Sequence, residues 1–433
     1  MTERNDGATP KLSKTPSRRL LTTVILVALI IRLAVTQLGN FENLMNADHI
    51  HAWEQGNVAR ALVAGRGFGS PFVSDQLSAI MPPVFPLIVA FCFKIFGVHT
   101  AASIFAIHAF NCLISALACI PLYLIARRSF GERVARWSAW GWALCPYGIY
   151  FAAAWAWSTH LLLFCLLWLI YLAQKMEESP QLGVWAGFGL LAGFAALTEP
   201  SVLVVVPFLM ALAACRLMKA GKRWLAPGLI ASLMLAATIS PWMVRNAIVF
   251  HRFIPMRDSM GLELWMGNNG YTERWTSDQL HPLHNEQELA DYNSMGEIAY
   301  MDHKAAQAKT YIAQHPGWYA WMSLRRAVYL WFGFWSFDPA YLRMEPTDPA
   351  NIPFATSLTL FALVGLSLAW SSKPFEVIRY GGVMFLLPAI YYFSHPEPYH
   401  LRPLDPLMVM LGAFAIVTVR ERVKSRPPVA MAY

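Results

Sequence analysis

The sequence predicts an all-α polytopic membrane protein. Of the 433 residues, 56% are hydrophobic and only 14% are charged, and the mean hydropathy is +0.40. Many apolar runs approach the ~20 residues that a helix needs to cross a bilayer. The 17 Trp and 16 Tyr fit many crossings of the membrane interface, where such rings collect. These observations place the chain among polytopic membrane proteins before any motif is considered.

Apolar runs predict about ten transmembrane helices within residues 20–420. The polar start, 1–19, and the end, 421–433, are expected to be cytoplasmic tails. The predicted spans are 20–39, 100–126, 134–155, 158–174, 183–198, 201–218, 224–241, 354–371, 377–394 and 405–420.

Three basic clusters predict the orientation. They lie at 127–136, 216–223 and 420–426, and short loops rich in Lys and Arg usually remain in the cytoplasm. All three can be cytoplasmic only if the apolar run 82–97 does not cross the membrane. We therefore expect 82–97 to be an interfacial or re-entrant piece.

With this topology, two stretches face the outer side of the membrane. They are 40–99, the first outer loop with its juxtamembrane helices, and the long segment 242–353. In the long segment a helix is predicted over 286–314, capped by Asn285. The aromatic stretch 318–335 is typical of a helix that lies at the interface.

Composition also excludes some function classes. The net charge of +8 comes from short clusters between apolar runs, so a nucleic-acid partner is not expected. The six cysteines lie in or beside apolar segments without a CxxC spacing, which argues against a disulfide framework or a zinc site.

The first outer loop carries the most suggestive group of ionisable residues. Asp48, His51 and Glu54 stand at three-residue intervals, so on a helix they would lie along one side. The pattern predicts an amphipathic helix at the membrane surface whose ionisable groups face a cleft.

Several stretches in fixed order resemble the GT-C superfamily of integral-membrane glycosyltransferases, and more narrowly glycosyltransferase family 39. Protein O-mannosyltransferases and the lipid A aminoarabinose transferase are relatives in that group. The stretches are ARALVAGRGFGSPF, PPVFPLIVAFCFKIFG, ALACIPLYLIARRSFGERVARWSAWGWALCPYGIYF, ALTEPSVLVVVP, SPWMVRNAIVFHRFIPMRDSMGLELWMGNN and HPEPYHLRPLDP.

This resemblance implies transfer of a sugar, with inversion, from a polyprenyl-phosphate carrier to an acceptor hydroxyl on the outer face. The acceptor (lipid, glycan or protein) is left open. The resemblance also implies a bacterial inner membrane, with the active site facing the periplasm. A carboxylate of the first outer loop is expected to be the general base.

The chain departs from the family pattern at two places. His51 stands where an Asp is common, about eight residues before Ala59, and 157–160 reads Trp-Ser-Thr-His where an acid is common. No metal ligands are therefore assigned, and the need for a divalent metal is left open.

For the base, Glu54 and Asp48 are both candidates, with Glu54 preferred because it lies in the better-matching run. A carboxylate near neutral pH suits removal of a hydroxyl proton. Either acid alone is as easily explained by a helix cap or an ion pair. His51 could orient an acid, although a solvated surface histidine is the simpler account.

The leaving phosphate needs a fixed cation or a metal. Arg245 with Asn246, and Arg402 with His400, are candidates at outer helix ends, where arginines that merely extend to the interface are also common. Glu199 is a candidate metal ligand or acceptor contact, with helix-end capping as its alternative. Asn268 and Asn269 could contact a sugar or phosphate, or could simply form a turn.

The rival hypothesis is a flippase for lipid-linked sugars or another polyprenyl-phosphate transporter. It would require polar groups near mid-membrane and paired interrupted helices. The predicted ionisable groups instead gather at one outer rim, which favours an enzyme. A non-catalytic scaffold with the same architecture is a further alternative.

Overall fold

The computed structural model describes residues 18–39, 53–72, 75–272, 280–333 and 348–425, and these form helices and no strand. The α-helices are α1 (Arg18–Leu38), α3 (Glu54–Val63), α4 (Val84–Phe96), α5 (Ala101–Leu117), α6 (Cys119–Phe130), α7 (Glu132–Ala143), α8 (Pro146–Ala154), α9 (Thr159–Met176), α10 (Leu182–Thr198), α11 (Val205–Lys219), α12 (Leu225–Phe250), α13 (Met260–Gly267), α14 (Glu286–Met295), α15 (Glu297–Gln314), α16 (Pro316–Phe332), α18 (Asp348–Trp370), α19 (Pro374–Leu386), α20 (Ala389–Phe393) and α21 (Asp405–Lys424). Three 3-10 helices are η2 (Pro200–Val204), η4 (Pro398–His400) and η5 (Arg402–Leu404).

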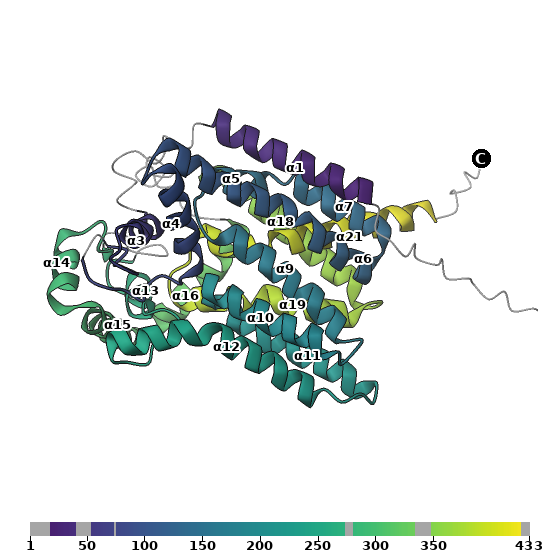
Figure 1. Cartoon of the computed structure of the whole chain (residues 1–433). Helices are drawn as coiled ribbons and strands as arrows, with labels where there is room; N and C mark the ends of the chain where they lie inside the picture. Colours follow the sequence, from purple (N-terminus) through teal and green to yellow (C-terminus); the bar gives the residue numbers. More distant parts are fainter. Residues whose placement is uncertain (1–17, 40–52, 73–74, 273–279, 334–347, 426–433) are drawn as a thin grey trace, which may run out of the picture.

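The long helices form one bundle, and the shorter helices α3, α13, α14 and α15 gather at one of its ends (Figure 1). The opposite end holds the three basic clusters. There Arg133 of α7 pairs with Glu421 of α21, and Arg216 of α11 lies 3.8 Å from Glu177. The clusters thus share one end of the bundle, as the orientation prediction requires.

Seven of the ten predicted spans fall in long apolar helical stretches of the part of the chain that the structure describes, one of which comprises α5 and α6 with a break at Ala118. The other three are shorter or broken. Span 183–198 is α10, of 17 residues, while 134–155 and 377–394 are each split into two helices. The split in 134–155 falls before Pro146, which has no N–H to continue the first helix.

Two further expectations about helix boundaries were wrong in detail. The helix predicted over 286–314 breaks at Gly296, whose φ of 78° lies in the left-handed region that favours glycine. Asn285 caps its first half, as predicted, and accepts bonds from the amides of Gln287 and Glu288. The span predicted to end at residue 241 continues as α12 to Phe250, so Arg245 lies within a helix.

The run 82–97 forms α4, which at 13 residues reaches about 20 Å and is too short for a ~30 Å hydrocarbon core. It packs against α3 through a small core that includes Trp53, Phe85 and Phe93. The first outer loop is thereby fixed to the bundle.

Helix contacts within the bundle depend on small residues and on buried polar groups. A Cβ at Gly189 of α10 would lie 2.1 Å from the carbonyl oxygen of Ala231 in α12, so these helices meet at backbone distance. Arg32 of α1 is fully buried and donates to Ser115 of α5 and to the carbonyls of Trp142 and Ala143. Arg32 therefore links three helices of the bundle through its side chain.

Candidate functional site

A cavity of about 460 Å³ lies where α3, η2, α13 and the segment 387–400 meet, at the end of the bundle that carries the short helices. Its wall also includes residues 80–82 of the first outer loop. These five segments, together with Phe72, Trp157 and residues 281–284, therefore line one space.

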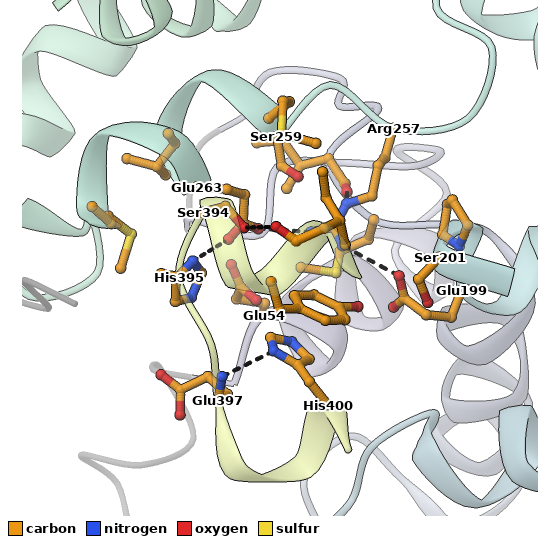
Figure 2. A pocket seen from close by; sticks show the side chains of 18 of the residues that line it. Glu54, Glu199, Ser201, Arg257, Ser259, Glu263, Ser394, His395, Glu397 and His400 are labelled. Atoms are coloured by element: carbon orange, nitrogen blue, oxygen red, sulfur yellow. Dashed lines mark hydrogen bonds and ion pairs between the residues drawn. The ribbon is translucent and has the colours of Figure 1, made fainter. Parts of the chain in front are cut away.

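Arg257 joins three of these segments. Its Nη1 lies 3.7 Å from Glu199 Oε1, its Nη2 lies 3.1 Å from Glu263 Oε1, and its Nε donates to the Ile80 carbonyl at 3.1 Å. Figure 2 shows Arg257 between the two carboxylates. Each of the three guanidinium nitrogens thus has a partner, a geometry that arginine provides and lysine does not.

Glu263, in the first turn of α13, also pairs with His395, whose Nδ1 lies 2.6 Å from its Oε2 (Figure 2). Burial alone would raise the pKa of Glu263. His395 and Arg257 outweigh that effect and hold the pKa well below its usual range. Glu263 is therefore ionised at neutral pH.

The end of α13 is fixed against the segment that carries His395. A Cβ at Gly267 would lie 2.1 Å from the Ser394 carbonyl oxygen, and the Asn268 side chain donates to the Phe393 carbonyl at 3.1 Å. Arg326 of α16 is fully buried and donates to Asn268 Oδ1 and to the Gly267 carbonyl. A cation at a helix C-terminus is favourable, so Arg326 stabilises the position of α13.

Glu54 is the first residue of α3 and lines the cavity. Trp53 just before it donates from its indole to the Ala156 carbonyl at 3.0 Å. His281 Nδ1 accepts from the Leu283 amide, so a neutral imidazole carries its proton on Nε2, which lies 3.4 Å from Glu54 Oε1. His281 can therefore donate to the carboxylate of Glu54 and orient it.

Aromatic rings form another wall of the cavity. Tyr391 stacks on His400 with ring centroids 3.7 Å apart, Tyr399 lies 4.5 Å from His400, and Trp157 lies 5.5 Å from Tyr399. All four line the cavity. Burial first, and then His395, hold the pKa of His400 well below its usual value, so this ring is neutral.

Two comparisons with known proteins found matches to this chain. Residues 81–243 match the family model of dolichyl-phosphate-mannose-protein mannosyltransferases, and no curated protein matches the chain. The fold is similar to that of the Archaeoglobus fulgidus oligosaccharyltransferase tethered with an acceptor peptide, at 11% identity and a TM-score of 0.50 over 94% of this chain and 50% of that one. These two matches support the resemblance to the GT-C superfamily that the sequence analysis described.

Two other solved GT-C structures are similar at a lower level. AglB from Archaeoglobus fulgidus, in complex with an inhibitory peptide and dolichol-phosphate, shares 11% identity with a TM-score of 0.47 over 93% of this chain and 50% of that one. ArnT from Cupriavidus metallidurans, bound to undecaprenyl phosphate, shares 12% identity with a TM-score of 0.42 over 96% and 82%. The present chain spans about half the length of the oligosaccharyltransferase that it matches. The seven long apolar helices among the described residues, together with the family match, show an integral membrane protein.

Three of the predicted site residues are brought together by the fold. Glu54, Glu199 and His400 all line the cavity, although they come from three separate regions of the sequence. Asp48 and His51 lie outside the described residues. The remaining predicted residues, Arg245, Asn246, Arg402, Asn268 and Asn269, are not among the lining residues.

Arg245 and Asn246 make structural contacts in α12. Arg245 donates to the Ser78 carbonyl at 2.8 Å and to the Phe68 carbonyl at 3.3 Å, and it lies over the Trp242 ring. Asn246 is fully buried and bonds to the Ile254 carbonyl. These contacts fix the first outer loop onto α12.

Arg402, Asn268 and Asn269 are similarly engaged away from the cavity. Arg402 lies over the Tyr147 ring at 4.3 Å, and its Nη1 is 3.4 Å from Asp405 Oδ2. The Asn269 amide donates to the Trp265 carbonyl at 2.6 Å, and its oxygen accepts from the Tyr271 amide. Both asparagines thus end α13, the turn role that the sequence left open as an alternative.

The cavity residues that sequence reasoning missed are mainly Arg257, Glu263, His281 and His395. They form no spaced motif, because four loops or helix starts supply them. Arg257 and Glu263 nevertheless lie within the family-like stretch that ends in GLELWMGNN. Their charges in that stretch are the signal that could have identified them. Within the described ranges, no group of three His, Cys, Asp or Glu side chains could hold a metal ion.

A buried acid, Glu297, holds the part of the first outer loop that reaches Arg257. Its Oε1 accepts from the Ala79 amide at 2.7 Å and its Oε2 accepts from the Tyr292 hydroxyl at 3.1 Å. Ile80, the next residue of that loop, bonds to Arg257. Burial raises the pKa of Glu297 to about 7.

We expect Glu297→Gln to change how stability depends on pH. The folded-state pKa is about 7 against an ordinary value of 4.5, so the stabilisation from Glu297 is complete below about pH 4.5 and is lost as the pH rises to about 7. The wild-type free energy of unfolding should therefore fall relative to the variant by roughly 3 kcal/mol across this window. Guanidinium titrations in detergent from pH 4 to 8 measure the difference, and parallel curves would contradict it.

Proposed function

We propose that this protein is a membrane glycosyltransferase that moves a sugar from a polyprenyl-phosphate carrier to an acceptor hydroxyl, with inversion. The observation that carries the proposal is the cavity, which places the Glu54 carboxylate and the Arg257 guanidinium around one space in a GT-C helix bundle. The match to dolichyl-phosphate-mannose-dependent enzymes over residues 81–243 supports a lipid-phosphate donor. The acceptor is a hydroxyl on the outer, periplasmic side of a bacterial inner membrane.

Glu54 is the proposed general base. It takes the proton of the acceptor hydroxyl while that oxygen forms a bond to the anomeric carbon. The bond between the anomeric carbon and the phosphate oxygen breaks, and the polyprenyl phosphate leaves with the electron pair. A single displacement of this kind inverts the anomeric centre. His281, through Nε2, holds the Glu54 carboxylate in place.

Charge grows on the phosphate as it leaves, and a fixed cation stabilises that charge. Arg257 is the one arginine among the described lining residues, so we assign it to the phosphate side of the cavity. Arg245 and Arg402, which the sequence suggested for this role, keep it as a rival hypothesis. A divalent metal would serve the same purpose, and a chelator in the transfer assay tests for one.

Glu54→Gln should abolish most transfer while sparing donor binding. Loss of a general base typically lowers the rate by about 10²- to 10⁴-fold. Purified protein would be incubated with radiolabelled polyprenyl-phosphate sugars, with and without chelator, and release of free polyprenyl phosphate measured. Asp48→Asn is the matched control and should remain active.

Full activity of Glu54→Gln with loss in Asp48→Asn would transfer the base role to Asp48. Donor binding without turnover in the wild type, unaffected by either change, would instead support the flippase alternative.

Arg257→Gln and Arg245→Gln, each measured on folded protein, should differ in their effect on donor binding. Loss of a hydrogen bond to a charged group costs about 1.5–3 kcal/mol, so Arg257→Gln should raise the donor Kd about tenfold or more, with Arg257→Lys less affected. Arg245→Gln should lower the melting temperature because the Ser78 and Phe68 carbonyls lose their donor.

The donor Kd of Arg245→Gln, measured on the folded fraction from size-exclusion chromatography, should stay near the wild-type value. A large rise in that Kd at an unchanged melting temperature would show that Arg245 contacts the donor instead.

A further inference from the structure

The cavity is lined by many carboxylate side chains. Its described lining holds four carboxylates, from Glu54, Glu199, Glu263 and Glu397, against the single guanidinium of Arg257. A protonated His395 in its pair with Glu263 would add one positive charge to the lining and would leave the acids in excess.

The positive charge of Arg257 is already shared. Glu199 and Glu263 both lie within 4 Å of its nitrogen atoms, and Ile80 accepts from the third. A sugar carboxylate brought into the cavity would therefore compete with Glu199, Glu263 and the donor phosphate for the one guanidinium of Arg257, and it would also be repelled by the remaining carboxylates.

A second wall of the cavity consists of aromatic rings. Tyr391 is stacked on His400, and Tyr399 lies between His400 and Trp157. Asn111 of α5 positions the Trp157 segment by donating to its carbonyl at 3.2 Å and to the Trp155 carbonyl at 2.9 Å. Such a wall can pack against the C–H surface of a sugar ring.

We infer that this cavity selects a hydroxyl-rich sugar without an acidic group and rejects donors whose sugar is a uronic acid. The inference rests on the proposed sugar site and specifies its ligand class. Each sugar hydroxyl is a donor, and an ionised carboxylate only accepts, so a neutral sugar satisfies the acids that face it. A sugar carboxylate would place acceptor against acceptor and like charge against like charge in a half-buried space.

Glu397 provides a way to test the charge alone. It lines the cavity, and its side chain accepts from the backbone amide of His400 at the start of η4. Glu397→Gln keeps an oxygen for that bond while removing one negative charge. Glu286 is exposed at the start of α14, so Glu286→Gln removes the same charge from outside the cavity and serves as control.

The test compares pairs of undecaprenyl-phosphate donors that differ only at C6. Glucose, mannose and galactose derivatives are each matched with the corresponding hexuronate, and Kd is measured by tryptophan fluorescence in detergent. Since the lipid and the phosphate are shared, the ratio of the two Kd values isolates the sugar carboxylate. We expect the hexuronate to bind about tenfold more weakly or worse, a difference of ~1.4 kcal/mol. Glu397→Gln should shrink the ratio about threefold or more, and Glu286→Gln should leave it unchanged.

Equal or tighter binding of the hexuronates would overturn the inference, as would a ratio that Glu397→Gln does not change. Measuring the turnover of each donor distinguishes failure of this inference from failure of the proposed function. Discrimination without turnover of any donor would support the cavity's selectivity and count against transfer. Equal turnover of hexose and hexuronate donors would support transfer and overturn the selectivity.

Discussion

The site depends on one guanidinium that holds three remote segments together. Arg257, in the connection between α12 and α13, forms an ion pair with Glu199 after α10 and bonds to Glu263 in α13 and to the Ile80 carbonyl of the first outer loop. A buried charge is tolerable only when it is paired and hydrogen-bonded. Because the three partners come from different elements, the same contacts that satisfy Arg257 also define the walls of the cavity.

The surrounding structure restrains each partner in turn. Glu297 and Arg245 fix the backbone at Ala79 and Ser78, next to Ile80. Arg326 and the close approach at Gly267 fix the end of α13, and thereby Glu263 and its partner His395. Preorganised polar groups are what an enzyme needs where charge develops during a reaction. In this account Arg245 and Asn268 contribute by supporting the site, while Arg257 and Glu54 face the ligand.

The sequence predicted the helical membrane fold well because apolar runs and basic clusters are local patterns that can be recognised within short stretches of the chain. Three of its candidate residues, Glu54, Glu199 and His400, line the cavity, and they lie beside helix ends or in stretches that resemble the family. The sequence could not pair Arg257 with Glu199, since the two are separated by the whole of α11 and α12 and no spacing relates them. Asn268 and Asn269 illustrate the opposite limit. A Gly-Asn pair is equally compatible with a ligand contact and with a helix end, and only the packing of α13 distinguishes the two.

The measurement that tests the account most directly is a structure of the protein with a non-hydrolysable polyprenyl-phosphate sugar bound. We predict that the sugar lies in this cavity, with Glu54 within about one hydrogen-bond length or one water of the anomeric face and Arg257 on the phosphate side. A donor bound beside Arg402 or Arg245, with the cavity empty of sugar, would contradict the account.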